Sequence, residues 1–129
     1  MNTWVLLFVL SLFIPLLMLI FGVVFLKKTP NKINPVYGYR SRRSMKSPEA
    51  WKFAHFLCAK IWIALGAILL VVSLVAMLFM LNKSEDVIGI VFQILMYAQL
   101  AIMILSIIPV EIALKRTFDE NGNKKSPKN

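Results

Sequence analysis

The chain contains few of the residues that build catalytic and metal sites. Among its 129 residues there is one cysteine, Cys58, and one histidine, His55. A lone cysteine excludes an internal disulfide, and a structural zinc site takes four ligands, which these two residues do not supply. The serines of the apolar stretches have no histidine or lysine at a spacing that would activate them as nucleophiles. The sequence therefore predicts a protein that is not an enzyme and that carries no metal or cofactor.

Charge is also scarce, and three long stretches have none. Only 16% of the residues are charged, against about 25% in an average soluble protein. A helix of about 20 apolar residues crosses the hydrocarbon core of a bilayer, and the charge-free stretches are Trp4–Leu26, Ile61–Leu81 and Val87–Val110. What remains is too short for a soluble catalytic domain. We predict an all-α membrane protein with one domain over residues 1–129 and three transmembrane helices at about 4–26, 61–81 and 87–110.

The basic residues predict how the chain is oriented in the membrane. Fourteen of the fifteen Lys and Arg residues lie in the loop 27–60 or after residue 110, and the turn between the second and third spans holds only Lys83. Positive residues beside membrane spans remain on the cytoplasmic side. We therefore expect an outside N-terminus, a basic cytoplasmic loop at 27–60, and a cytoplasmic C-terminus. Anionic headgroups of membrane lipids are the expected partners of this charge, because no nucleic-acid recognition fold fits the sequence.

Local signals predict where the helices begin and bend. Ser47, Pro48 and Glu49 have the residue types of an N-cap followed by the first helical turn, so a helix is expected from Pro48 through the second span. The part of it before the span is expected to be an amphipathic cytoplasmic helix, with His55 on the charged side. Pro15 is expected to kink the first span. Residues 115–129 form a polar tail, and its part from residue 118 to residue 129 is expected to be disordered.

The third span and its cytoplasmic end carry several polar residues. Gln93 and Tyr97 are four residues apart and could hydrogen-bond a neighbouring helix. Glu111 is four residues before Lys115, which predicts a helical ion pair at the membrane interface. A working carboxylate at Glu111 would instead suit a small oligomeric transporter subunit, and a structural role in a larger membrane complex is a further alternative.

The loop between the first two spans has the most distinctive residues. Gly38 permits a turn before Arg40, and the guanidinium groups of Arg40 and Arg43 can bind carboxylates or phosphates through two hydrogen bonds. Trp51 and His55 are four residues apart, so they lie on adjacent parts of one helix face. A basic loop that only contacts lipid headgroups is the simpler interpretation of the same residues.

This loop resembles the signature of the SdpI-like proteins. The residues that carry the resemblance are Asn34, Gly38, Tyr39, Arg40, Ser41, Ser44, Met45, Ser47, Glu49, Trp51, Ala54 and His55. These are bacterial membrane proteins related to the immunity protein against the sporulation-delaying peptide toxin. The three-span layout around the loop is also similar.

The resemblance implies a function in resistance to a secreted membrane-active peptide toxin at the bacterial cell membrane. It also implies a signalling role, in which a small repressor protein is held at the membrane. The residues expected to recognise a partner are Asn34, Gly38, Tyr39, Arg40, Arg43, Ser47, Trp51 and His55. A homo-oligomer is compatible with the sequence.

Overall fold

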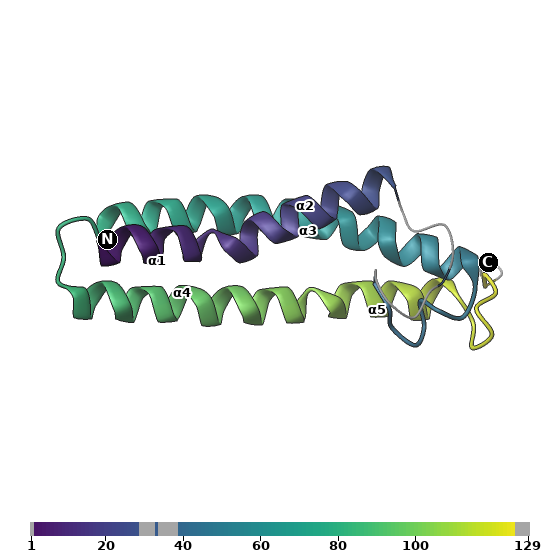
Figure 1. The fold of residues 1–129 in the computed structure, drawn as a ribbon. Coiled ribbons are helices and arrows are strands. Elements are labelled where there is room, and N and C mark those ends of the chain that lie inside the picture. The colour runs from purple at the N-terminus through teal and green to yellow at the C-terminus, as the bar shows by residue number, and fades with distance from the viewer. Residues whose placement is uncertain (1, 29–32, 34–38, 126–129) are drawn as a thin grey trace. The chain divides into compact units, whose positions relative to one another are not determined.

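The computed structural model describes residues 2–28, 33 and 39–125, and in these residues the regular structure is helical. The helices are α1 (Thr3–Ser11), α2 (Phe13–Lys27), α3 (Pro48–Phe79), α4 (Glu85–Leu105) and α5 (Ile107–Thr117), shown in Figure 1. They form three helical stretches that are long and apolar enough to cross a membrane, at Thr3–Lys27, Pro48–Phe79 and Glu85–Thr117. The all-α prediction with three spans is confirmed.

Two of the three helical stretches are interrupted, each shortly before a proline. Proline has no N–H, and its ring excludes the carbonyl of the residue four positions earlier. The first stretch breaks at Leu12, whose N–H bonds to Val9 O at 3.2 Å, and Pro15 follows. The third stretch breaks at Ser106, and Pro109 follows. The expected kink in the first span is therefore present, three residues before Pro15.

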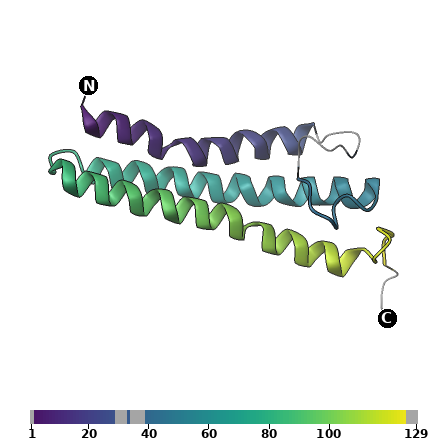
Figure 2. The ribbon, with the colours of Figure 1, turned by 60° about the horizontal axis from the view of Figure 1, so that its bottom comes forward.

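The chain divides into two compact units. We call Met1–Ile20 with Trp62–Leu105 the span unit, and Phe21–Ile61 with Ser106–Asn129 the loop unit. In the span unit, α1 packs against α4, and the Trp4 indole N–H donates to Met77 O of α3 at 2.7 Å. Figures 1 and 2 show these helices running along one another.

The core of the span unit is made of large apolar side chains. Ile14, Met18 and Leu69 are buried at its centre, and the partly buried residues around them are Trp62, Leu65, Met96, Ile102 and Met103. Gly66 permits a close approach of the first stretch to α3. A Cβ atom there would lie 3.0 Å from Leu19 Cγ and 3.1 Å from Pro15 O.

One hydrogen-bonded polar group lies within this apolar unit. The Gln99 amide Nε2 donates to Ser11 O at 2.9 Å and to Ser73 Oγ at 2.7 Å, so it joins all three spans. Ser11 O is the carbonyl that would accept from residue 15 in an unbroken helix, and Pro15 has no N–H to give. From the sequence, Gln93 and Tyr97 were the residues of the third span expected to bond a neighbouring helix. Both side chains are exposed instead, Tyr97 at 72% and Gln93 as well.

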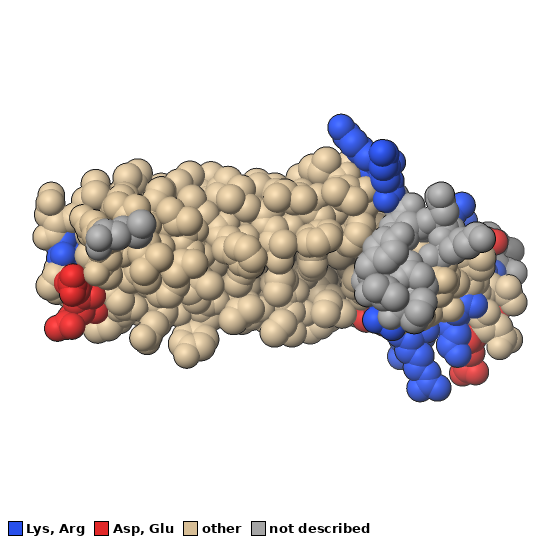
Figure 3. Space-filling view, viewed as in Figure 1, with Lys and Arg blue, Asp and Glu red and all other residues tan. Residues whose placement is uncertain are grey.

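The surface of the span unit is almost free of charge. Its charged residues are Lys83, Glu85 and Asp86, all at the turn between α3 and α4, and the face seen in Figure 3 is tan along the helices. Large apolar side chains are exposed along its helices, such as Phe13 at 63% and Ile94 at 62%. An exposed apolar surface of this extent is suited to lipid rather than to water.

In the loop unit, α3 begins where the sequence predicts. The Ser47 hydroxyl oxygen accepts the N–H of Ala50 at 3.0 Å, which is the geometry of a helix N-cap. His55 was expected on the charged side of the amphipathic helix. That placement is wrong, because His55 is buried together with Trp51. Whether this part of α3 lies on the cytoplasmic membrane surface stays a prediction.

The polar tail is folded between residues 118 and 125, so the expected disorder is wrong for that part. Phe118 and Lys124 form an antiparallel bridge, and Asp119 Oδ1 accepts the N–H groups of Asn121 and Asn123, each at 2.9 Å. Gly122 supplies the positive φ of 82° that the tight turn needs. We call residues 118–125 the tail hairpin. The expectation for residues 126–129 lies outside the described residues.

Candidate functional site

His55 is at the centre of the site in the loop unit. Its Nδ1 lies 2.8 Å from Trp51 O, and its Nε2 accepts the backbone N–H of Tyr39 at 2.8 Å. A carbonyl can only accept and an N–H can only donate, so these partners fix the neutral ring with its proton on Nδ1. The imidazole therefore holds the backbone at Tyr39 against α3, which is a positioning role.

Aromatic rings surround the imidazole. The Trp51 ring centroid is 4.3 Å away, one turn earlier on α3, and the Phe25 ring of α2 meets it edge-on at 4.9 Å. Trp51 and His55 are both fully buried. Trp51 and His55 therefore lie on adjacent parts of one helix face, as expected, and this face is buried in the loop unit.

Tyr39 connects the loop to the end of the third helical stretch. Its phenol donates to Glu111 Oε2 of α5 at 2.5 Å. Burial, together with this hydrogen bond and the charge of Glu111, raises the pKa of Tyr39 above its ordinary value, so the phenol stays a neutral donor. Glu111 is thus bonded to Tyr39, and the expected ion pair with Lys115 is absent from the described part of the chain.

Two serines close the turn that follows Tyr39. The Ser41 N–H donates to Ser44 Oγ at 2.9 Å, and the Ser44 N–H donates back to Ser41 Oγ at 3.1 Å. The buried Ser44 hydroxyl is also 3.1 Å from Tyr39 O. Reciprocal side-chain to backbone bonds of this kind fix a turn without regular secondary structure. They fix the backbone that carries Arg42 and Arg43.

The tail hairpin is attached to the start of α3. The Ser47 hydroxyl donates to Gly122 O at 2.5 Å, and Phe118 meets Phe53 edge-on at 5.4 Å between centroids. A Cβ atom at position 122 would lie 2.7 Å from the carbonyl carbon of Lys46, so only glycine fits this approach. Ser47 thus caps α3 and binds the tail hairpin with one hydroxyl group.

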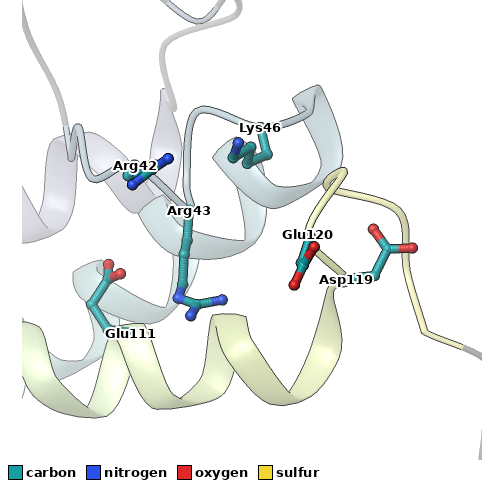
Figure 4. Close-up of a pocket in the computed structure, with 6 residues that line it drawn as sticks. All are labelled: Arg42, Arg43, Lys46, Glu111, Asp119 and Glu120. Carbon is teal, nitrogen blue, oxygen red and sulfur yellow. The ribbon is translucent and has the colours of Figure 1, made fainter.

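A pocket of about 350 Å³ lies between the serine turn, α5 and the tail hairpin. It is lined by charged residues of both signs: Arg42, Arg43, Lys46, Glu111, Asp119 and Glu120. Figure 4 shows the Arg43 side chain extending between Glu111 and Glu120. The described residues contain no group of three or more histidine, cysteine or acidic side chains that could hold a metal ion.

The structure brings together four of the residues expected at the site, Tyr39, Ser47, Trp51 and His55, within the loop unit. Arg40 and Arg43 are exposed on the same unit, and Asn34 and Gly38 lie outside the described residues.

The residues expected to recognise a partner did not include three participants in the site: Phe25, Ser44 and Glu111. The spacing of three residues between Ser41 and Ser44 is typical of serines that hydrogen-bond each other's backbone, so the sequence does contain a signal for Ser44. The contact of Phe25 with the imidazole and the bond of Glu111 to Tyr39 have no sequence signal, because their partners are distant in the chain.

Comparison with known proteins places this site within a family. The model of the SdpI/YfhL protein family matches residues 31–110, which include the signature loop and the second and third apolar stretches. The protein of Bacillus subtilis (strain 168) described as uncharacterized protein YfhL is 40% identical over 53 residues, or 41% of this chain and 48% of that protein. The chain therefore spans about half the length of this curated relative. No solved structure matches. The matched range covers most of the chain and contains the bonded pair Tyr39 and His55, so this multi-pass membrane protein belongs to the SdpI/YfhL family.

Proposed function

We propose that this protein protects a bacterial cell against a secreted membrane-active peptide, as an immunity protein of the cell membrane. The chain belongs to the SdpI/YfhL family, and its resemblance to the SdpI-like proteins implies toxin immunity. The observation that carries it is the bond between the Tyr39 N–H and His55 Nε2. This bond fixes the backbone at Tyr39 against α3, and recognition of a partner through specific contacts is stronger when the backbone is ordered beforehand.

The fixed loop presents arginines for recognition. Arg42 and Arg43 are exposed between Ser41 and Ser44, whose reciprocal hydrogen bonds hold the backbone. A guanidinium binds a carboxylate or phosphate through two parallel hydrogen bonds, and binding is stronger when the backbone is ordered beforehand. We infer that this surface contacts the protein partner, and that a small repressor protein held at the membrane is such a partner.

The proposal includes an orientation in the membrane. With the N-terminus outside, the loop unit lies on the cytoplasmic side, where a repressor is found, and the turn near Lys83 faces outward. The span unit would then meet a peptide toxin from the bilayer or from outside, since its exposed surface is apolar. Protection and signalling would thus belong to different parts of the chain.

Cell survival tests the proposal. Cells that express the protein are exposed to a panel of secreted membrane-active peptides, and the amount of protein in the membrane is measured for each variant. We expect His55→Ala and Arg43→Ala to lower protection against the cognate peptide at unchanged membrane levels. Lys52→Ala is the matched control, because Lys52 is exposed on the same turn of α3 as His55 and has no part in the site. Full protection by both site variants would contradict the proposal.

The same assay distinguishes immunity from a small transporter subunit. Glu111→Gln removes a charge but keeps a side-chain oxygen that can accept from Tyr39, so the contact that shapes the loop is retained. We expect this variant to protect. A transporter that depends on ionisation of Glu111 would lose its activity, and loss of protection at a normal membrane level would favour that function.

A further inference from the structure

The charged pocket of the loop unit has two walls of opposite sign. Arg42, Arg43 and Lys46 come from the serine turn and the residues after it, and the carboxylates come from α5 and the tail hairpin. Within the part of the chain that the structure describes, no ion pair joins the two walls. Opposite charges that line a pocket without contacting each other leave a place for a ligand that carries both.

Two residues of the acidic wall are each held by hydrogen bonds to one carboxylate oxygen. Glu111 is positioned by the Tyr39 phenol through Oε2, and Asp119 by backbone N–H groups of its own turn through Oδ1. In Figure 4, Arg43 points between Glu111 and Glu120. The arginine forks suit a phosphate group, and carboxylates beside them suit an ammonium group. Together they match a phosphate ester that also carries a primary amine.

We propose that this pocket binds the headgroup of phosphatidylethanolamine, with its phosphate on the basic wall and its ammonium on the acidic wall. The pocket volume of about 350 Å³ is within the range of small-molecule sites, which begins at about 300 Å³. The lipid is favoured over a soluble amine phosphate because Ile108 and Ile112, 51% and 47% exposed, lie on the same short helix as Glu111. Acyl chains can cover these side chains.

The acidic wall provides the selectivity. An anionic headgroup such as that of phosphatidylglycerol has a phosphate and no ammonium, so the carboxylates of Glu111, Asp119 and Glu120 would repel it. Without them the basic wall would attract any phosphate. The tail hairpin thus turns a general anion site into one that requires both charges.

Native mass spectrometry of the full chain tests this. The purified protein is offered phosphatidylethanolamine and phosphatidylglycerol in equal amounts, and the bound lipids are counted. We expect phosphatidylethanolamine to be retained at least about threefold more, as for a single exposed charge contact. Arg43→Gln should lower retention of both lipids. Glu120→Gln should lower phosphatidylethanolamine and raise phosphatidylglycerol.

Matched controls keep the result specific. Arg116→Gln and Glu49→Gln remove exposed charges of the same types in the same unit outside the pocket, and both should retain the wild-type lipid ratio. Soluble phosphoethanolamine should compete only weakly, and competition as strong as that of the lipid would overturn the assignment to a lipid. Preference for phosphatidylglycerol in the wild type, or a ratio unchanged by Glu120→Gln, would overturn the two-wall site.

Discussion

Replacing Gln99 with leucine tests whether a side chain of the third span completes the broken helix of the first. The Gln99 amide donates to Ser11 O and to Ser73 Oγ, and the residue is 1% exposed. Leucine has nearly the same size but gives no hydrogen bond. After the change, Ser11 O has no donor, because Pro15 cannot supply one. The Ser73 hydroxyl can turn to its own helix backbone.

The size of the effect follows from the two bonds. Side-chain hydrogen bonds between membrane helices contribute about 0.6 kcal/mol each on average and at most about 1.7. Leucine also removes the Gln99 Oε1 atom, which is buried and accepts no hydrogen bond from the residues that the structure describes, and this offsets part of the loss. We expect the free energy of unfolding to fall by about 1 kcal/mol. Gln93→Leu, the same change at an exposed position of α4, should have little effect.

A double-mutant cycle with Pro15→Ala isolates the contribution of the Ser11 carbonyl. Alanine at position 15 provides an N–H for Ser11 O, so in that background Gln99→Leu should cost about half as much. The measurement is unfolding of the purified protein in micelles by a denaturing detergent, followed by helical circular dichroism. An equal loss in both backgrounds would refute the argument that Gln99 replaces the missing proline donor.

Three further predictions follow from close approaches and charge placement. Gly66→Ala should destabilise the protein by about 1 kcal/mol through crowding, whereas Gly89→Ala, where a Cβ meets open space, should be neutral or slightly stabilising in the same unfolding assay. Gly122→Ala should release the tail hairpin, because the added Cβ meets the Lys46 backbone, and faster hydrogen exchange at residues 118–125 would show it. A phosphatase fused at Lys83 should be active and one at the C-terminus inactive; the reverse would overturn the proposed orientation.

The sequence alone determines the three spans, because a helix without charges for about 20 residues has no favourable place except a bilayer. It also determines the start of α3, since the cap bond from Ser47 to Ala50 joins residues three apart. The interruption near Pro15 is predictable for the same local reason. Each of these depends on neighbours in the chain, so local residue types were sufficient.

Only the tertiary structure decided which polar groups are paired. The spans are apolar on every side, so no periodicity showed that Gln99 rather than Gln93 faces inward, or that Gly66 rather than Gly89 lies at a contact. Tyr39 bonds Glu111 although 72 residues separate them, and the tail hairpin is attached to Ser47, 75 residues before Gly122. Such pairs form because packing places a donor beside an acceptor that would otherwise lose its bond to water, and residue types in sequence do not encode that distance.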